Sequence, residues 1–303
     1  MAGSRDGLEV GLLGFRQAVA EHGLGVEGIH IARASHAPVA FRWVSDDRRE
    51  VYSVSKTFTS VAVGIAQSEG LLGLDDRVLE HLPQFVSTAA AGVEGMTIRH
   101  LLTMTAGIDY RWDDPDTDHP GDPAEDFLST SLHATPGSWF AYRGTNSYLL
   151  SRIVAAVSGE DMRDFLMPRL FVPLKIGNPQ WLRCPLGYSM GAVGLQLRTE
   201  EIARLGITLL HGGQFQGQQL VPAEYVDLMH GPALASDLQG VEGRYGLHCW
   251  HCDRDDAWRM DGLYGQFCIM FPHQRACITL TSHYEKPTTD ILDAVWDELV
   301  PYL

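Results

Sequence analysis

The sequence predicts a mixed α/β protein of two lobes, in which an antiparallel sheet with flanking helices carries a large helical block. Two observations predict this class. Strand-like segments lie near both ends of the 303-residue chain, at 27–33, 38–44, 244–250, 266–271 and 276–282. Between them, from about 71 to 229, helical patterns alternate with loops rich in Pro, Gly and Asp. The strands of the two ends can therefore form one sheet beside an inserted helical lobe.

Three helices complete this outline. Residues 8–22 form an amphipathic pattern that ends at Gly23, and residues 289–299 close the chain as a helix. These two terminal helices are expected to flank the sheet. A third, apolar helix is expected from about residue 53 to 69, where Gly70 ends it.

The same elements divide the chain into two expected lobes. Residues 1–50 and 240–303 would form one discontinuous α/β lobe, and residues 51–239 the mostly helical lobe. A cleft between two lobes is a common place for a small-molecule site. Nothing in the sequence indicates the oligomeric state.

Charge and composition argue against several partners and locations. The chain carries 38 acidic and 23 basic residues, a net charge of −15, and such a surface repels the phosphates of nucleic acids. No stretch of 18 or more residues lacks charges and helix breakers, so no membrane span is predicted. Arg5, Asp6 and Glu9 stand where a signal peptide needs an apolar run. We therefore expect a cytoplasmic protein.

A Ser-x-x-Lys pair marks the start of the third helix. Ser53 and Lys56 are three residues apart and therefore share a helix face. A serine hydroxyl becomes a useful nucleophile when a neighbouring base takes its proton, and a desolvated lysine amine can do so. Lysine occurs at three positions only, 56, 175 and 286, which makes its place here notable. The alternative is a capping serine beside a surface lysine.

The segments around and after this pair resemble the class C β-lactamase and esterase family. They cover about residues 40–300 in the family's order, and the motifs are similar to those of its 6-aminohexanoate-dimer hydrolases and carboxylesterases. The similar segments are 53–60 (SVSKTFTS), 69–72 (EGLL), 96–107 (MTIRHLLTMTAG), 136–142 (PGSWFAY), 146–150 (NSYLL), 171–174 (FVPL), 194–195 (GL), 203–206 (ARLG) and 261–266 (DGLYGQ). The resemblance implies the β-lactamase/transpeptidase fold and Ser53 as nucleophile with Lys56 as base.

The family's second motif, Tyr-x-Asn, places its tyrosine on Tyr142. A phenol there can relay a proton between the lysine, the serine and the leaving group. The asparagine position falls on Gly144, which departs from the pattern, and Asn146 is the candidate to replace it. A core tyrosine before a helix is the alternative for Tyr142.

The third motif, Lys/His-Thr/Ser-Gly at a strand edge, maps onto Met260, Asp261 and Gly262. The N–H groups of Ser53 and Leu263 would then bind the oxyanion. Met260 lacks the cation that would hold a β-lactam carboxylate, and Asp261 adds a negative charge. These two departures from the family motif argue against an efficient β-lactamase and favour a neutral or cationic acyl substrate. The alternative is that residues 260–262 form only a tight turn between strands.

Two aromatic residues and two possible metal sites complete the candidates. Tyr110 and Trp112 follow the Gly107-like position, near the active site in similar hydrolases, and either contact substrate or pack within the loop. The segment 248–252 (HCWHC) looks like a metal cluster, but as a strand it would turn Cys249 and Cys252 to opposite faces. The acidic residues 113–119 lack the ligand spacing of a calcium loop. No metal site is predicted, and the five cysteines are expected to be free thiols.

Together these features predict a serine hydrolase that cleaves an ester or amide bond of a small molecule through an acyl-enzyme on Ser53. No cofactor is required. The alternatives are β-lactamase or D-amino-acid peptidase activity, or a non-catalytic relative that binds a ligand.

Overall fold

The computed structural model describes residues 3–34, 36–112, 121–231, 234–235, 244–254 and 256–303. The predicted acidic loop at 113–119 and the lobe boundary between 239 and 240 lie outside them. The α-helices are α1 (Gly3–His22), α2 (Ser55–Ser68), α3 (Val78–His81), α4 (Ile98–Leu102), α5 (Pro123–Ser129), α6 (Gly144–Ser158), α7 (Met162–Leu166), α8 (Thr199–Leu210), α9 (Ala223–Met229) and α10 (Thr289–Glu298). Shorter helical turns are η1 (Tyr52–Val54), η2 (Pro83–Phe85), η3 (Val93–Gly95), η4 (Met167–Phe171) and η5 (Val300–Tyr302).

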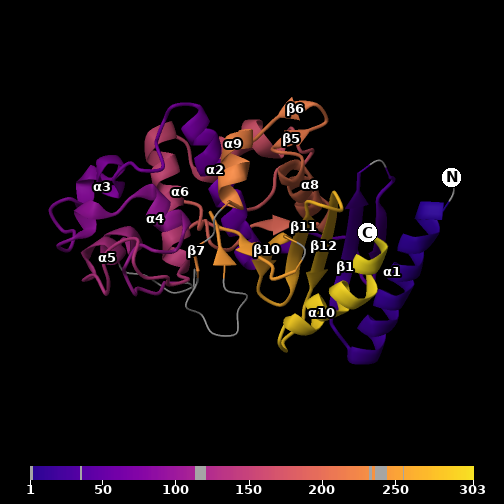
Figure 1. The fold of residues 1–303 in the computed structure, drawn as a ribbon. Helices are drawn as coiled ribbons and strands as arrows, with labels where there is room; N and C mark the ends of the chain where they lie inside the picture. Colours follow the sequence, from indigo (N-terminus) through magenta and orange to yellow (C-terminus); the bar gives the residue numbers. More distant parts are fainter. Residues whose placement is uncertain (1–2, 35, 113–120, 232–233, 236–243, 255) are drawn as a thin grey trace.

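One large antiparallel sheet joins the two ends of the chain, as predicted (Figure 1). Its order is β2-β1-β12-β11-β10-β9-β8-β7, so β1 near the N-terminus pairs with β12 near the C-terminus. The strands are β1 (Val26–Arg33), β2 (Val39–Arg42), β7 (Leu234–Ala235), β8 (Arg244–Tyr245), β9 (Trp250–His251), β10 (Trp258–Gly262), β11 (Gln266–Phe271) and β12 (Ala276–Ser282). Two small ribbons, β3 (Arg49–Glu50) with β4 (Gln196–Leu197) and β5 (Gln214–Phe215) with β6 (Gln218–Gln219), lie outside it.

The terminal helices α1 and α10 pack together and cover one face of this sheet (Figure 1). Apolar residues of α1 recur at helical spacing, at positions 8, 12, 15 and 19, and all four are buried. They meet the inward residues of β11 and β12, such as Phe267 and Ile278, in one core cluster. The predicted flanking of the sheet by the terminal helices is confirmed.

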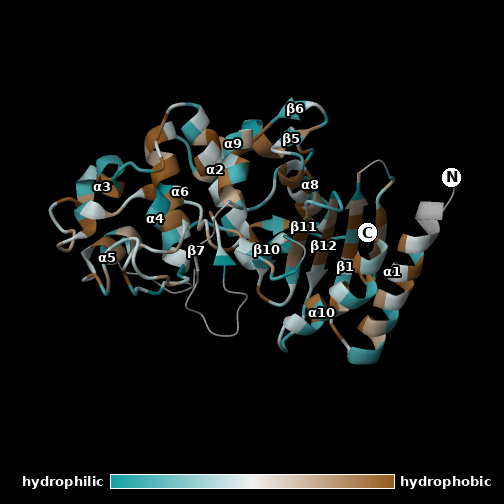
Figure 2. Cartoon of the chain, viewed as in Figure 1, coloured by the Kyte–Doolittle hydropathy of each residue, from teal (hydrophilic) through white to brown (hydrophobic). Residues whose placement is uncertain are grey.

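The helical lobe and α8 occupy the other face. Helix α8 packs against β1, β11 and β12, whereas α2, α3, α4, α5 and α7 pack around α6 (Figure 1). Residues 55–66 of α2 are all buried, although the helix carries both polar and apolar side chains (Figure 2). Alternate residues of the sheet, including Cys268 and Met270 of β11, point into this second core. The α2 helix therefore lies inside the lobe, with its first turn directed at β10.

The predicted single strand at 244–250 is wrong. The chain forms the short strands β8 and β9, and between them His248 adopts a left-handed φ of 58°. Tertiary contacts impose this turn: a Cβ on Gly246 would lie 1.9 Å from the carbonyl oxygen of Met229, and the backbone N–H of His248 donates to the carbonyl of Leu102. These contacts come from distant segments, so local alternation could not reveal them.

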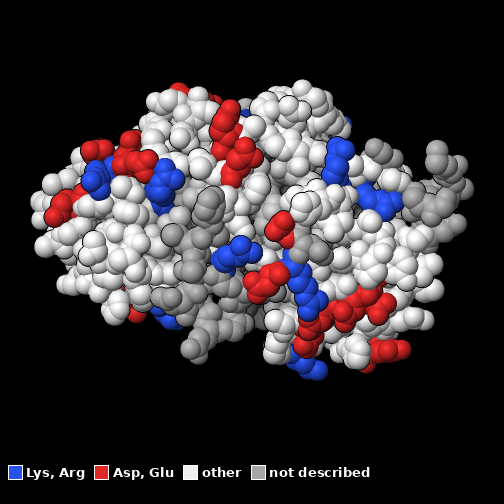
Figure 3. Space-filling view, in the orientation of Figure 1, with Lys and Arg blue, Asp and Glu red and all other residues white. Residues whose placement is uncertain are grey.

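Charged side chains are dispersed over the molecular surface. On the face in Figure 3, basic residues form separate groups near acidic ones rather than a continuous basic stripe. Within the described ranges, no helix has both the length and the apolar character needed to cross a membrane.

Candidate active site

Ser53 lies in the turn η1, and Lys56 lies in the first turn of α2 that follows it. The Lys56 amine donates a hydrogen bond of 2.8 Å to the Ser53 hydroxyl, and a second one of 3.2 Å to the carbonyl of Ala192. Lys56 is only 3% exposed. The amine is therefore held in place beside the hydroxyl, within the distance that proton transfer requires.

The backbone just before Ser53 is unusual. Tyr52 has a φ of 47°, in the left-handed region that side-chain-bearing residues rarely adopt. Its ring meets the ring of Tyr264 edge to face, with 5.2 Å between the centroids. Strained backbone next to a reactive side chain is common at active sites. No sequence signal predicted this conformation.

Tyr142 stands on the other side of Lys56, just before α6. The Lys56 Nζ lies 4.9 Å from the centroid of the Tyr142 ring, and this ring also packs against Tyr245 and Trp250. The fold thus brings Tyr142 to the Ser–Lys pair, as the resemblance implied. Its role in proton transfer stays a prediction.

Strand β10 passes directly beside the nucleophile. Along β10, strand β9 pairs with Trp258 and Arg259 alone, so within the described residues the edge of β10 beyond them has no strand partner on that side. A Cβ on Gly262 would lie 2.5 Å from the carbonyl oxygen of Val51, two residues before Ser53. Glycine is therefore required at this position for the close approach of the two backbones.

A cavity of about 360 Å³ opens at this junction. It collects residues from η1, the segment before α6, β9, β10 with its following turn, and the start of α10. Its lining residues are Ser53, Tyr142, Trp250, Arg259, Asp261, Gly262, Leu263, Tyr264, Thr288, Thr289 and Leu292. Five of the predicted site residues, Ser53, Tyr142, Asp261, Gly262 and Leu263, thus share one cavity.

The charge of Asp261 is compensated in a way that the sequence did not reveal. The Nε of Arg259 donates to a carboxylate oxygen of Asp261 at 2.9 Å, because residues two apart on β10 share a face. Burial raises the pKa of Asp261, while the Arg259 guanidinium acts in the opposite direction. Met260, between them, is buried in the core of the helical lobe. The wall of the cavity therefore carries an ion pair rather than a net charge.

Three predicted contact residues are not among those that line the cavity. Asn146 is 1% exposed, and its amide donates to the carbonyl of Arg143 at 3.1 Å. Tyr110 packs edge to face on Phe127, and Trp112 packs on a core tyrosine of α6. The loop after residue 107 thus turns these aromatic rings into the core of the helical lobe.

His248 is a buried residue next to the site that sequence reasoning had considered only as a metal ligand. Its Nδ1 lies 2.8 Å from the carbonyl of Leu102 and therefore donates, while its Nε2 accepts from the Ser147 hydroxyl at 2.8 Å. The Thr57 hydroxyl donates to the His248 carbonyl. Burial lowers the pKa of His248 to about 3, and Lys56 in its protonated form acts in the same direction. A neutral imidazole thus links α2, α4 and α6 behind Lys56.

The expectation that Cys249 and Cys252 point to opposite sides of one strand assumed a continuous strand at this position, which the structure does not form. They are nevertheless placed apart: the thiol of Cys249 donates to the carbonyl of Met229, and Cys252 belongs to the core beneath α1. Within the described residues, no three His, Cys, Asp or Glu side chains are grouped so that they could hold a metal ion.

The chain is similar to several known proteins. The family model described as Beta-lactamase matches residues 1–300. The 6-aminohexanoate-dimer hydrolase of Paenarthrobacter ureafaciens is 26% identical over 284 residues, which are 85% of this chain and 70% of that protein. The solved structure of EstCE1, a hydrolase with promiscuous acyltransferase activity, has a TM-score of 0.74 at 20% identity and covers 96% of this chain and 99% of that one.

A D-stereospecific amidohydrolase from Streptomyces sp. has a TM-score of 0.73 at 19% identity, over 95% of this chain and 98% of that one. These superpositions confirm the β-lactamase/transpeptidase-like fold. The chain therefore belongs to the β-lactamase family of serine hydrolases.

Proposed function

We propose that this protein hydrolyses an ester or amide bond of a small, uncharged acyl substrate through an acyl-enzyme on Ser53. The observation that carries the proposal is the 2.8 Å contact between the buried Lys56 amine and the Ser53 hydroxyl, at the wall of a cavity. A structural serine and lysine would not need to meet at a cavity. No metal or organic cofactor takes part in the proposed reaction.

In the acylation step, the Ser53 oxygen attacks the substrate carbonyl carbon while its proton passes to a neutral Lys56 amine. The negative charge on the carbonyl oxygen is stabilised by the N–H groups of Ser53 and Leu263. Tyr142, beside Lys56, passes the proton to the leaving alkoxide or amine as the bond to it breaks. Water then attacks the acyl-enzyme, the Lys56–Tyr142 pair takes its proton, and Ser53 is regenerated with release of a carboxylic acid.

The cavity wall supports an uncharged acyl group. Met260 supplies no cation for a substrate carboxylate, and the charge of Asp261 is compensated by Arg259. The sequence allowed a neutral or a cationic acyl substrate. With Asp261 compensated, we retain the neutral one. The names of the similar proteins, a dimer hydrolase of 6-aminohexanoate and a D-stereospecific amidohydrolase, support amides beside esters. Hydrolysis of β-lactams or D-amino-acid peptides ranks lower, because their carboxylates need a cation.

We also propose a cytoplasmic location. All five cysteines are free and buried, including Cys268 and Cys277, whose sulfur atoms lie 3.4 Å apart without a disulfide. The odd number of cysteines argues against a framework of disulfides and fits a reducing compartment. The acidic net charge supports a small-molecule substrate rather than nucleic acid.

The proposal is tested with p-nitrophenyl butyrate and a fluorophosphonate probe. We expect the parent protein to hydrolyse the ester and to be labelled once. Ser53→Ala should lose labelling and turnover, and Lys56→Met should lower kcat/KM by roughly 10²–10⁴-fold, because it removes the base. Ser55→Ala is the matched control: it removes another buried hydroxyl, which has no hydrogen-bond partner within the described residues.

Labelling and turnover of Ser53→Ala at the parent's level would refute the catalytic role of Ser53. A parent protein that binds an ester analogue but neither hydrolyses the ester nor becomes labelled would be a non-catalytic relative. Nitrocefin turnover far faster than ester turnover would reverse the ranking of substrates.

A further inference from the structure

A second cavity, of about 300 Å³, lies between the outer side of α8 and the end of β1. Its walls also include the start of the turn to β2 and the turn between β11 and β12. None of its lining residues lines the catalytic cavity. Its volume is at the lower end of the range of small-ligand pockets, about 300–1,000 Å³.

The cavity is basic although the chain is strongly acidic. Three arginines from three separate segments, Arg33, Arg204 and Arg275, line it together with a single carboxylate, Glu200. The whole chain, in contrast, has a net charge of −15. Such a reversal of local charge concentrates anions at this position.

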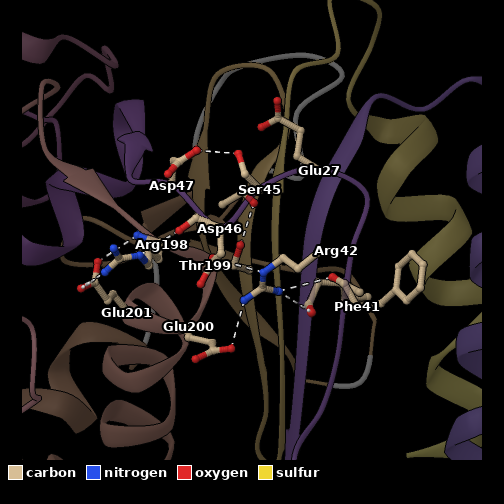
Figure 4. Close-up of polar contacts among 12 residues, drawn as sticks. Glu27, Phe41, Arg42, Ser45, Asp46, Asp47, Arg198, Thr199, Glu200 and Glu201 are labelled. Atoms are coloured by element: carbon tan, nitrogen blue, oxygen red, sulfur yellow. Dashed lines mark hydrogen bonds and ion pairs between the residues drawn. The ribbon is translucent and has the colours of Figure 1, made fainter.

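The carboxylate of Glu200 does not compensate these arginines. It accepts a hydrogen bond of 3.1 Å from Arg42, which reaches it from β2 (Figure 4). Arg204 donates to the backbone carbonyls of Leu174 and Lys175. Within the described residues, neither Arg204 nor Arg275 forms an ion pair with a carboxylate, whereas Arg48 and Arg152 elsewhere in the chain do. Positive charge at the cavity is therefore available to a ligand.

A buried polar atom adds to this evidence. His30 lines the cavity and is 8% exposed, and its Nδ1 has no hydrogen-bond partner within the described residues. A buried polar atom without a partner is rare in folded proteins and often marks the position of an absent water or ligand. Burial lowers the pKa of His30, so this imidazole adds no positive charge to the cavity at neutral pH.

The remaining walls are apolar, formed by Ala32, Ala34, Pro38, Ile207 and Leu210. A bare inorganic anion would leave these walls without contacts, whereas an alcohol would leave the guanidinium groups without a counter-charge. We propose that this cavity binds an aliphatic monocarboxylate, with its carboxylate at Arg204 and Arg275 and its chain against Ile207 and Leu210. This site is separate from the proposed catalytic function and does not depend on it.

The proposal is tested by titration calorimetry of the whole protein with hexanoate, hexanol and inorganic phosphate. We expect hexanoate to bind more tightly than either of the other two. Arg275→Gln should weaken hexanoate roughly tenfold, since a charge-assisted hydrogen bond is lost. Ile207→Glu should abolish binding by placing a negative charge on the apolar wall. Arg77→Gln, an exposed arginine of the helical lobe, is the matched control and should bind like the parent.

Equal affinity of Arg275→Gln and the parent for hexanoate would overturn the proposal. Hexanol binding as tightly as hexanoate would also overturn it, since the arginines would then contribute nothing. Phosphate binding as tightly as hexanoate would do the same for the apolar wall. Arg275 lies on an exposed turn, so its replacement tests the site even if Ile207→Glu does not fold. The parent's turnover of p-nitrophenyl butyrate is measured in parallel. Its absence would count against the proposed hydrolase function but not against this binding site.

Discussion

At the residue scale, the position of Ser53 depends on how closely β10 approaches the turn that carries it. Gly262 allows this approach, because its backbone passes beside the carbonyl of Val51 without an intervening Cβ. The sequence marked both Ser53 and Gly262 as candidates. The contact between their backbones is a property of the folded chain.

We predict that Gly262→Ala impairs catalysis more than stability. Its Cβ would lie 2.5 Å from the Val51 carbonyl oxygen and 3.0 Å from the Cβ of Gln266, so the turn before Ser53 must shift. A displacement of this kind should lower kcat/KM by about 10²-fold and the free energy of unfolding by about 1–3 kcal/mol. Kinetics with p-nitrophenyl butyrate and urea unfolding measure the two effects.

Gly95→Ala is the matched control for this variant, because a Cβ on Gly95 meets no atom within 4 Å. It should keep the parent's kcat/KM. Unchanged kinetics of Gly262→Ala would contradict the inferred dependence of Ser53 on this approach.

At the element scale, the turn between β8 and β9 connects the sheet to the helices behind Lys56. His248 occupies this turn and bonds to Leu102, Ser147 and Thr57 from three helices. Periodicity predicted a strand here, because Tyr245, Leu247, Cys249 and Trp250 are apolar. The chain forms a turn instead, in which His248 has a left-handed φ and contacts distant helices.

We predict that His248 makes the stability of the protein depend on pH. Its pKa is about 3 in the folded protein and about 6.5 when unfolded, so between these values the unfolded state binds the proton and the folded state does not. Its contribution to the free energy of unfolding is therefore complete above pH 6.5. Below it, the contribution falls by about 1.4 kcal/mol per pH unit until about pH 3.

The measurement is urea unfolding of the parent and of His248→Asn at pH 7, 6 and 5. Asparagine tolerates the left-handed φ and keeps a donor for the Leu102 carbonyl, but it does not titrate. The difference in unfolding free energy between parent and variant should shrink as the pH falls. An identical pH dependence for both proteins would show that His248 does not titrate on unfolding.

At the scale of the whole molecule, the sheet joins two apolar cores. Phe267, Ile269 and Phe271 of β11 point to α1 and α10, whereas Cys268 and Met270 point to the helical lobe and α8. The two cores thus share one sheet. We therefore expect that a loss of packing in one core also lowers the stability of the other.

We predict that Phe15→Ala, in the core beneath α1, lowers the free energy of unfolding by about 3–5 kcal/mol. Phe15 is completely buried. The urea midpoints for loss of far-UV circular dichroism and for loss of fluorophosphonate labelling at Ser53 should fall together. Val10→Ala, at an exposed position of the same helix, should leave both midpoints near those of the parent. Labelling that survives to the parent's urea concentration would indicate lobes that unfold independently.

By itself, the sequence determined the strands at both ends except the one expected at 244–250, the flanking helices, the Ser53–Lys56 pair and its resemblance to the family that the comparisons confirm. Periodicity and short motifs are local, so residues three or four apart can reveal them. The tertiary structure alone decided that Arg259 compensates Asp261, that Tyr110 and Trp112 turn into the core, and that residues 246–249 form a turn. Each of these outcomes depends on contacts between segments far apart in the chain, and their energies are absent from any local pattern.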